Sequence, residues 1–147
     1  MPLQFLSPIH KAMRQIGIHL DGRMDALELQ SSEGHLMSYL RSYGPCPISE
    51  LHRVFGLKRS TLTSLLDRLE SRELIRREPH PSDRRSVLVR LTRRGRTLAE
   101  KVQKPVADLE NRIRAEIAAE DLRGFHRVLR AIAEVTRVEV KPEKEES

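Results

Sequence analysis

Apolar residues recur at helical spacing in the first part of the chain. One stripe with steps of three or four residues is formed by Ile9, Met13, Ile16, Leu20, Met24 and Leu27. Such steps place all its members on one face of an amphipathic helix. We expect this helix to begin near Ser7-Pro8, because Ser can accept a bond from a free helical N–H group and Pro suits the first helical position.

Three shorter helical segments follow, separated by turn-forming residues. The first is predicted to be capped by Ser31 or Ser32 and to end at Gly44, and the second ends at Gly56. The third has apolar residues at the i, i+3, i+4, i+7 spacing, namely Leu62, Leu65, Leu66 and Leu69. Two short helices joined by a turn that contains Gly56 predict a helix-turn-helix.

The period of the pattern changes after this helix. Residues 74–78 and 86–91 are short runs that contain β-branched residues, and the basic, turn-forming segment 79–85 lies between them. This pattern predicts a β-hairpin with a positively charged tip. A helix-turn-helix followed at once by such a hairpin is typical of a winged helix.

The remaining sequence returns to helical spacing. Thr92 is the expected cap of a helix whose apolar stripe is Leu98, Val102, Val106, Leu109, Ile113 and Ile117. Pro105 interrupts the stripe, so a kink or break is expected near Lys104. A last helix should begin near Glu120-Asp121. Its expected buried residues are Leu122, Phe125, Leu129 and Ile132. Residues 141–147 have nothing to bury and are expected to be disordered.

Positive charge is concentrated in the middle of the 147-residue chain. Residues 41–104 contain 16 Lys and Arg against 7 Asp and Glu, whereas the rest contains 11 against 14. The formal net charge is +6. A basic segment between near-neutral or acidic ends is the electrostatic pattern of a nucleic-acid-binding module. A solvated charged surface is the alternative interpretation of the same pattern.

Several functional classes are disfavoured by what the sequence lacks. It has no apolar run approaching about 18 residues and no basic, hydrophobic leader, so neither a membrane span nor a secretory signal is expected. The single Cys46 excludes an internal disulfide and fits a reducing compartment, so a cytoplasmic protein is expected. No HExxH spacing, Gly-rich phosphate loop or GxSxG elbow occurs. We therefore expect no metal, no cofactor and no enzymatic activity.

Two segments together resemble one known family. Residues 57–70 resemble the recognition helix of the MarR family of bacterial and archaeal transcription regulators. Asp83-Arg84-Arg85, followed by residues 87–92 and Gly95, resembles the wing signature of that family, which is Asp-x-Arg, a strand, Leu-Thr and Gly. The resemblance covers nearly the whole chain.

The resemblance implies a mainly α fold with a small β-wing, a winged helix-turn-helix. It further implies a homodimer in which the N- and C-terminal helices form an intertwined dimerisation domain. The expected organisation is a dimerisation helix over residues 1–30, a DNA-binding domain over 31–92, dimerisation helices over 93–140 and a tail over 141–147. The implied function is that of a repressor, released from a pseudo-palindromic operator by a small-molecule ligand. An architectural winged-helix protein with little sequence preference is the alternative.

Small hydroxyl residues occupy the face of the predicted recognition helix opposite its leucines. Such a face can enter a major groove, where hydroxyls bond base edges and Thr methyls meet thymine methyls. The residues expected to contact DNA from this helix are Lys58, Arg59, Ser60, Thr61, Thr63, Ser64 and Arg68. For Arg68, local pairing with Asp67 or Glu70 is the alternative to a phosphate contact.

The wing supplies the other expected contacts. Arg85 is expected in the minor groove, with Arg84 as the alternative or as a phosphate contact. Asp83 cannot favourably face DNA, so we expect it to hold an Arg by a bidentate pair and to shape the loop. Further phosphate contacts are expected from Arg76, Arg77 and Arg90.

The chain departs from the family pattern at two positions. The family usually has Gly after the recognition helix, where this chain has Arg72-Glu73-Leu74. Lys58 stands where members often have a Ser-type cap, and its charge opposes the positive end of the helix dipole. A phosphate at the same helix end would reverse the sign of that interaction.

The family layout places a ligand cavity between the first two helices and the DNA-binding lobe. Its expected lining residues are His10, Met13, His35 and Tyr39. The alternative for each is that it only packs one helix against another. Cys46 is not expected to act as an oxidation sensor, because the family's known sensing cysteine lies close to the N-terminus.

Overall fold

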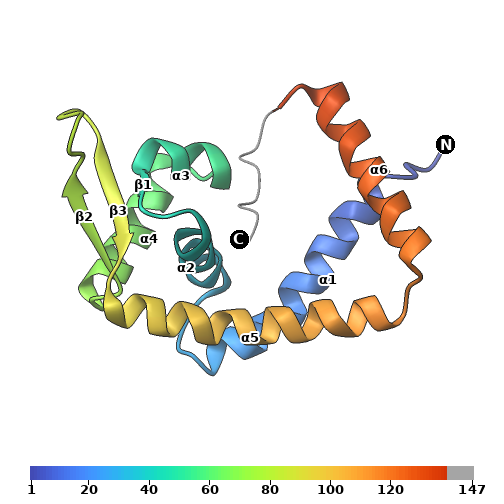
Figure 1. Cartoon of the computed structure of the whole chain (residues 1–147), viewed down its shortest axis with the longest axis horizontal. Helices are drawn as coiled ribbons and strands as arrows, with labels where there is room; N and C mark the ends of the chain where they lie inside the picture. The colour runs from blue at the N-terminus through green and yellow to red at the C-terminus, as the bar shows by residue number, and fades with distance from the viewer. Residues whose placement is uncertain (139–147) are drawn as a thin grey trace. The chain divides into compact units, whose positions relative to one another are not determined.

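The computed structural model describes residues 1–138, and within them it contains six helices and one three-stranded antiparallel sheet (Figure 1). The elements are α1 Leu6–Asp25, α2 Ser31–Tyr43, β1 Cys46–Pro47, α3 Ile48–Phe55, α4 Arg59–Ser71, β2 Ile75–Pro79, β3 Val87–Leu91, α5 Arg93–Ala115 and α6 Ala119–Thr136. This order confirms the mainly α fold with a small β-wing. The expected disordered tail, 141–147, lies outside the described residues.

The chain divides into two compact units, the first ending at Pro105 and the second beginning at Val106. The first unit contains α1 to α4, the sheet and the N-terminal part of α5. The second contains the remainder of α5 and α6. The winged helix-turn-helix therefore lies entirely within the first unit.

The sheet has the strand order β1-β3-β2. β2 and β3 form the predicted hairpin, in which Arg76 is opposite Arg90 and Arg77 is opposite Val89. β1 was not predicted, because two residues are too few to show the alternation of a strand. It pairs with β3 by placing Cys46 opposite Val89, and both side chains are fully buried.

Leucines from the three helices of the helix-turn-helix region build the core of the first unit. The predicted apolar face of α4 is confirmed, since Leu62, Leu65, Leu66 and Leu69 are each at most 1% exposed. They belong to one cluster with residues of α2, α3 and the sheet, including Leu36, Met37, Leu51, Ile75 and Val89. Burying this face of α4 leaves its opposite face in solvent.

Two predicted helix caps are wrong, although both helices begin close to the expected residues. α1 begins at Leu6, so Ser7 lies inside the helix, and Pro8 is tolerated because the first-turn N–H groups lack helical partners in any case. α2 begins at Ser31 after Gln30, whose backbone N–H donates to Glu33 Oε1 at 3.0 Å. The reciprocal bond of a Glu three residues into the helix replaces a Ser cap.

Of the kink or break expected near Lys104, the break does not occur, because α5 continues through Pro105 from Arg93 to Ala115. A proline removes one backbone hydrogen bond, whereas the bonds of the neighbouring turns remain. Ala99 and Val102, which precede the proline in the same helix, are buried and hold this part of the helix against the core. The predicted cap is confirmed, since Thr92 Oγ1 accepts the backbone N–H of Gly95 at 3.0 Å.

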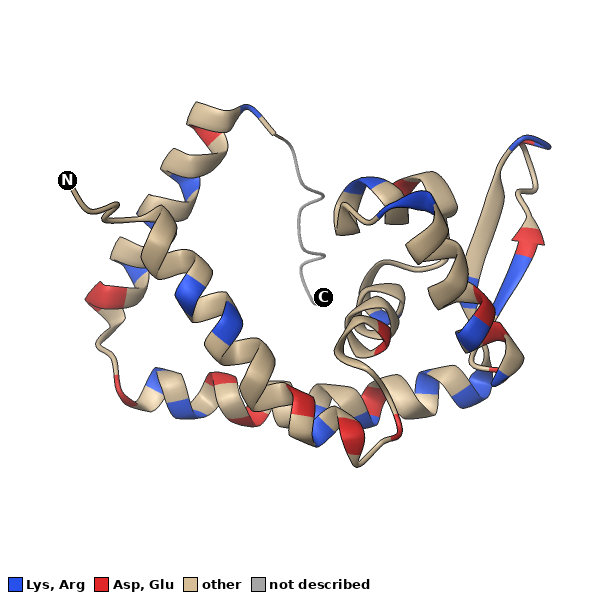
Figure 2. Ribbon diagram, turned by 180° about the vertical axis from the view of Figure 1, so that it is seen from behind, with Lys and Arg blue, Asp and Glu red and all other residues tan. Residues whose placement is uncertain are grey.

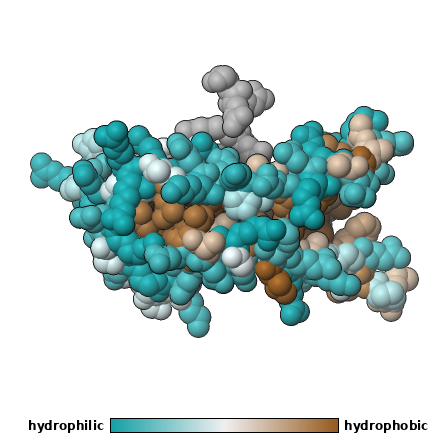
Figure 3. Space-filling model, turned by 90° about the horizontal axis from the view of Figure 1, so that it is seen from below, coloured by the Kyte–Doolittle hydropathy of each residue, from teal (hydrophilic) through white to brown (hydrophobic). Residues whose placement is uncertain are grey.

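The helices outside the winged helix-turn-helix expose much of their apolar stripes. α6 starts as predicted, with the Ala118 N–H donating to Asp121 Oδ2 at 2.8 Å, but none of its residues is buried. The expected burial of Leu122, Phe125, Leu129 and Ile132 is therefore wrong for a single chain, and Phe125 is 54% exposed. In α1, Leu20 and Met24 are buried, whereas Met13 is 65% exposed. Apolar surface is visible between hydrophilic regions in Figure 3.

The turn after α4 brings three elements together. Glu73, where the family usually has Gly, adopts a left-handed conformation with φ +59°, and the Leu74 N–H donates to the Leu69 carbonyl at 3.0 Å. The Leu74 carbonyl in turn accepts the Thr92 N–H at 3.0 Å. A Cβ added to Gly95 would lie 1.9 Å from the oxygen of the same carbonyl. The start of α5 therefore needs glycine to approach the end of the recognition helix.

Replacing Gly95 with Ala is expected to lower the free energy of unfolding by more than about 2 kcal/mol, because the backbone carbonyl cannot move away without losing its bond to Thr92. Urea unfolding followed by circular dichroism measures the change. Gly22→Ala is the control, since nothing lies within 4 Å of its added Cβ, and it should stabilise α1 by up to about 1 kcal/mol. Equal unfolding midpoints for Gly95→Ala and the unsubstituted protein would contradict the close approach.

Candidate nucleic-acid interface

The solvent face of α4 presents small polar side chains. Ser60, Thr61, Thr63 and Ser64 are all exposed, and helical spacing predicted this for Ser60, Thr63 and Ser64. The Thr63 hydroxyl donates to the Arg59 carbonyl at 2.9 Å, so its donor is used within the helix while its methyl group and an oxygen lone pair remain. This face can lie against a nucleic-acid groove without steric obstruction.

The N-terminus of α4 combines free N–H groups with positive charge. Lys58 is the N-cap residue and provides no side-chain cap, so the first N–H groups of the helix have no side-chain acceptor from it. Both Lys58 and Arg59 are exposed. A helix N-terminus carries partial positive charge, and two adjacent cations add to it. The arrangement favours an anion such as a phosphate group.

Local hydrogen bonds define the tip of the hairpin. Asp83 Oδ1 accepts the backbone N–H of Arg85 at 3.0 Å, and the Asp83 carbonyl accepts the Ser86 N–H at 3.0 Å. His80 Nδ1 accepts the Ser82 N–H at 3.1 Å. Asp83 therefore shapes the loop through the backbone, and the expected bidentate pair with an Arg side chain is not formed. Arg84 and Arg85 are exposed at the tip, where Figure 2 shows positive charge.

Arg77 of β2 binds two carboxylates of α4. Its Nη2 donates to Asp67 Oδ1 at 2.7 Å and to Glu70 Oε1 at 3.0 Å. Its Nε and its backbone N–H both donate to Glu70 Oε2, at 3.2 Å and 3.1 Å. These bonds fix the base of the hairpin against the recognition helix.

The ion pairs alter two of the expected phosphate contacts. Arg77 is occupied by Asp67 and Glu70, and Arg90 Nε donates to Glu78 Oε1 at 2.8 Å. Arg76 is exposed. The sequence contains a signal for the Arg77 contact. Asp67 and Glu70 are three residues apart, so they lie on one face of a helix, and this helix directly precedes the strand that contains Arg77.

The contacts of Arg77 shift two pKa values. Hydrogen bonding from Arg77 lowers the pKa of Glu70 from its ordinary 4.5, against a smaller opposing effect of burial. Hydrogen bonding to Glu70, followed by that to Asp67, raises the pKa of Arg77. Both groups are thus held in their charged forms by the contact between helix and hairpin.

Arg68 is not paired as the sequence alternative suggested. Its Nη2 donates to Gln30 Oε1 at 3.3 Å, across 38 residues, and among the described residues it forms no ion pair with Asp67 or Glu70. The side chain is exposed.

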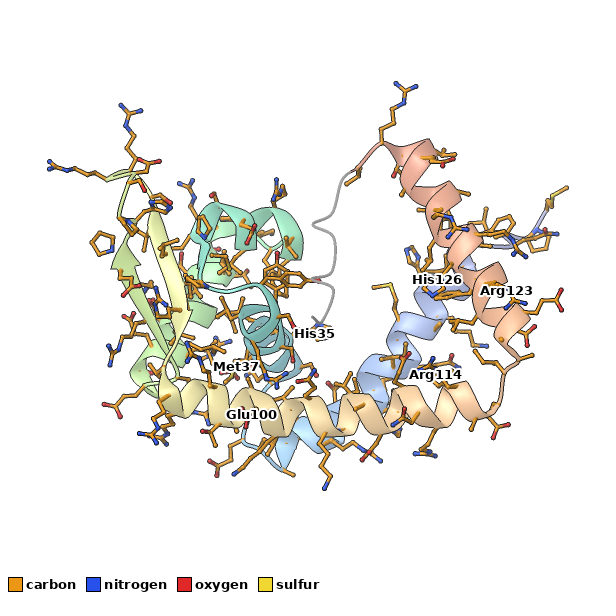
Figure 4. All side chains as sticks on the ribbon, viewed as in Figure 1. His35, Met37, Glu100, Arg114, Arg123 and His126 are labelled. Carbon is orange, nitrogen blue, oxygen red and sulfur yellow. The ribbon has the colours of Figure 1, made fainter. Side chains whose placement is uncertain are left out.

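The expected ligand-binding residues do not converge on one of the three cavities that we describe. His10 and Met13 of α1 and His35 of α2 are exposed, whereas Tyr39 is half-buried and packs edge-on against Phe55 at a centroid distance of 5.6 Å. Figure 4 shows His35 and Met37 on α2, and of these two Met37 is buried.

The described cavities have volumes of about 350, 510 and 220 Å³, and other residues line all three. Among residues 1–138, no group of three or more His, Cys, Asp or Glu side chains is arranged to hold a metal ion. No helix in the same range is long and apolar enough to cross a membrane. Cys46 is fully buried in β1.

Sequence comparison relates the chain to bacterial regulators. A family model described as "MarR family" matches residues 29–87. The HTH-type transcriptional regulator PecS of Dickeya dadantii is 31% identical over 123 residues, which cover 82% of this chain and 74% of PecS. The multiple antibiotic resistance protein MarR of Salmonella typhimurium is 29% identical over 114 residues, covering 77% and 79% of the two chains.

Solved structures show the same fold. A mutant of E. coli MarR in complex with operator DNA has a TM-score of 0.73 at 25% identity, covering 86% of this chain and 91% of that one. The Staphylococcus aureus MepR–DNA complex has a TM-score of 0.79 at 17% identity, covering 91% and 99%.

We expect the stability contributed by Arg77 to depend on pH. Because the pKa of Glu70 is lowered in the folded state, its contribution is fully present above the ordinary value of 4.5 and is lost as the pH falls through the folded value. The free energy of unfolding of the unsubstituted protein should therefore exceed that of Arg77→Gln above pH 4.5, and the difference should shrink in more acidic solution.

Urea unfolding at a series of pH values between about 2 and 7 measures this difference. Glu70→Gln is the matched control, because it removes the titrating carboxyl group. In this variant the free energy of unfolding should depend less on pH over the same range. Parallel curves for the unsubstituted protein and Arg77→Gln would rule out the contact as a source of stability.

Proposed function

Because the chain belongs to the MarR family, we propose that it is a sequence-specific regulator of transcription that binds double-stranded DNA. The observation that supports this most directly is the combination, within one compact unit, of an exposed hydroxyl face on α4, an uncapped cationic helix N-terminus and an arginine-bearing hairpin. Catalysis has no part in the proposal. We propose that it acts in the cytoplasm, where it would meet chromosomal DNA.

The recognition helix α4 is proposed to enter the major groove. Ser60, Thr61, Thr63 and Ser64 then face base edges. Lys58 and Arg59 lie where a phosphate approaches the helix N-terminus, and Arg59 is also long enough to reach a guanine edge. Arg68, exposed in the last turn of the helix, is proposed to contact a phosphate at the rim of the groove.

The tip of the hairpin is proposed to reach the minor groove. Arg85 is the inserted side chain, because a narrow groove concentrates negative potential, and Arg84 binds the adjacent phosphate. Asp83 contributes by holding the Arg85 backbone, which presents the two arginines in a fixed loop.

The functional unit is proposed to be a homodimer. A single chain leaves large apolar side chains exposed on α1, on the second half of α5 and on α6, including Met13, Ile113 and Phe125. Burying such surfaces between two copies removes them from water. We accordingly assign residues 1–30 and 93–140 to dimerisation and residues 31–92 to DNA binding.

Regulation is proposed to be repression that a small molecule relieves. The relative NicR of Pseudomonas putida, 34% identical over 73 residues, is named a transcriptional repressor, which supports the sign of regulation. The proposed ligand site involves His10, Met13, His35 and Tyr39. Because a single chain leaves three of these four exposed, the site requires the second copy to complete it.

A footprint on fragments selected from the source genome tests the proposal. A regulator protects a discrete inverted repeat whose half-site centres are about 10 base pairs apart or a multiple of that. Titration of the duplex should give two chains per site. Uniform protection of every fragment would instead support an architectural protein that coats DNA.

Arg85→Ala is expected to weaken binding to the protected duplex by more than about tenfold and to reduce the slope of log affinity against log salt by about 1.8, because one charge contact is lost from each chain of the proposed homodimer. Fluorescence anisotropy at several salt concentrations measures both quantities. Arg94→Ala is the control, since Arg94 lies in the first turn of α5 and pairs with Glu73 at 3.8 Å. Unchanged affinity in Arg85→Ala would remove the wing from the interface.

Lys58→Ser is expected to have opposite effects on folding and on binding. A Ser cap should raise the free energy of unfolding by about 0.5–1 kcal/mol, whereas loss of the charge in both chains of the proposed homodimer should weaken DNA binding and lower the salt slope by about 1.8. Lys58→Ala, which removes the charge without adding a cap, separates the two effects. A stabilised variant with unchanged affinity would show that no phosphate sits at this helix end.

A further inference from the structure

Arginines at the end of α4 contact the junction between α1 and α2. Arg72, the C-cap residue of α4, donates from Nη1 to the Glu28 carbonyl at 2.7 Å, across 44 residues. The same nitrogen lies 4.0 Å from Glu33 Oε2. Arg68 reaches Gln30 at the longer distance of 3.3 Å. The end of the recognition helix is thus fastened to the segment that connects the first two helices.

Glu33 makes this contact more than a surface ion pair. Its side chain is only 6% exposed, while that of Arg72 is 33% exposed. One carboxylate oxygen of Glu33 accepts the backbone N–H of Gln30 at the start of α2. The other carboxylate oxygen lies 4.0 Å from Arg72 Nη1. A buried carboxylate is stabilised by a positive charge beside it. The Glu33 carboxylate therefore favours one position of the Arg72 guanidinium, next to it.

The backbone on each side of this contact is held in an uncommon conformation. Glu28, whose carbonyl accepts the bond from Arg72, has φ +56°, and Glu73, which follows Arg72, has φ +59°. Left-handed conformations are unfavourable for residues with a side chain and persist where surrounding contacts hold them. Arg72 provides such a contact between the two turns.

Arg72 lies at the opposite end of α4 from Lys58. Its guanidinium is directed to the α1–α2 junction, whereas the face proposed to enter the groove begins at the N-terminus of the helix. Arg77 fastens the same half of α4 to the hairpin through Asp67 and Glu70. The C-terminal half of the helix is therefore held by polar contacts from two sides, in addition to the burial of its leucines.

We propose that Arg72 is a positioning residue for DNA binding, which sets the orientation of α4 by fastening its end to the Glu28 carbonyl and to Glu33 of the α1–α2 junction. A recognition helix must keep its orientation for its side chains to meet base edges, because small displacements break those contacts. Arg72 acts without touching DNA. This inference rests on the proposed DNA-binding function and adds a residue to it.

The test compares Arg72→Gln with the unsubstituted protein on the duplex protected in the footprint. The affinity should fall by about five- to tenfold, as expected for loss of a charge-assisted bond. The slope of log affinity against log salt should stay unchanged, because no phosphate contact is lost. The fraction of active protein is fixed by titration at high concentration, and thermal unfolding confirms that the variant is folded. Arg94→Ala, a neighbouring exposed arginine, should bind normally.

A second substitution separates positioning from a general loss of stability. Glu33→Gln in the Arg72→Gln background removes the unpaired buried charge and retains an oxygen to accept the Gln30 N–H. Stability should recover while the affinity remains low, because the bond to the Glu28 carbonyl is still absent.

The following results would overturn the inference. An affinity within twofold of the unsubstituted protein would show that Arg72 does not position the helix. A salt slope reduced by about 1.8, one phosphate in each chain of the homodimer, would make Arg72 a phosphate contact. If the double variant recovers affinity together with stability, Arg72 contributes to folding and does not position the helix for DNA binding. Failure of the unsubstituted protein to protect any discrete site would instead overturn the proposed function, and this inference with it.

Discussion

Burial of the leucine face of α4 organises the first compact unit around a single helix. Leu62, Leu65, Leu66 and Leu69 are almost completely removed from water and join α2, α3 and the sheet in one core. Because the leucines occupy one face of the amphipathic helix, their burial leaves the residues of the opposite face exposed to solvent. The polar surface that serves recognition is thus a consequence of the packing that stabilises the domain.

The hairpin and α5 acquire their positions from contacts at the C-terminal end of the same helix. Arg77 joins β2 to Asp67 and Glu70, and Gly95 allows the first turn of α5 to approach the Leu74 carbonyl. These contacts involve an ion pair and a close backbone approach rather than apolar area. These contacts fix the orientation of the hairpin and of the first turn of α5. A hydrogen-bonded ion pair and a close backbone approach each allow a narrow range of geometries, whereas hydrophobic burial tolerates small rotations.

The positive charge of the central segment serves two purposes. Arg72, Arg77 and Arg90 bind carboxylates or carbonyls of the same chain. By contrast, the cations at the start of α4 and at the tip of the hairpin extend into solvent. A basic composition attracts a nucleic acid from any direction. The internal pairing of Arg72, Arg77 and Arg90 leaves the cations at the start of α4 and at the hairpin tip among those that an external partner can meet.

Periodicity and turn chemistry predict the order of the helices and of the hairpin, the buried face of α4 and the capping role of Thr92, because they depend on residues that are neighbours in the sequence. This local information is the part of the fold that the sequence contains. It did not determine β1, the continuity of α5 through Pro105 or the partners of Arg72 and Arg77. These depend on residues distant in the chain, such as the strand opposite Cys46 and the junction at Glu28. Which arginines pair with groups of the same chain follows from the fold. Identical side chains in a basic segment have the same chemistry, and they differ only in which carboxylates or carbonyls lie next to them in three dimensions.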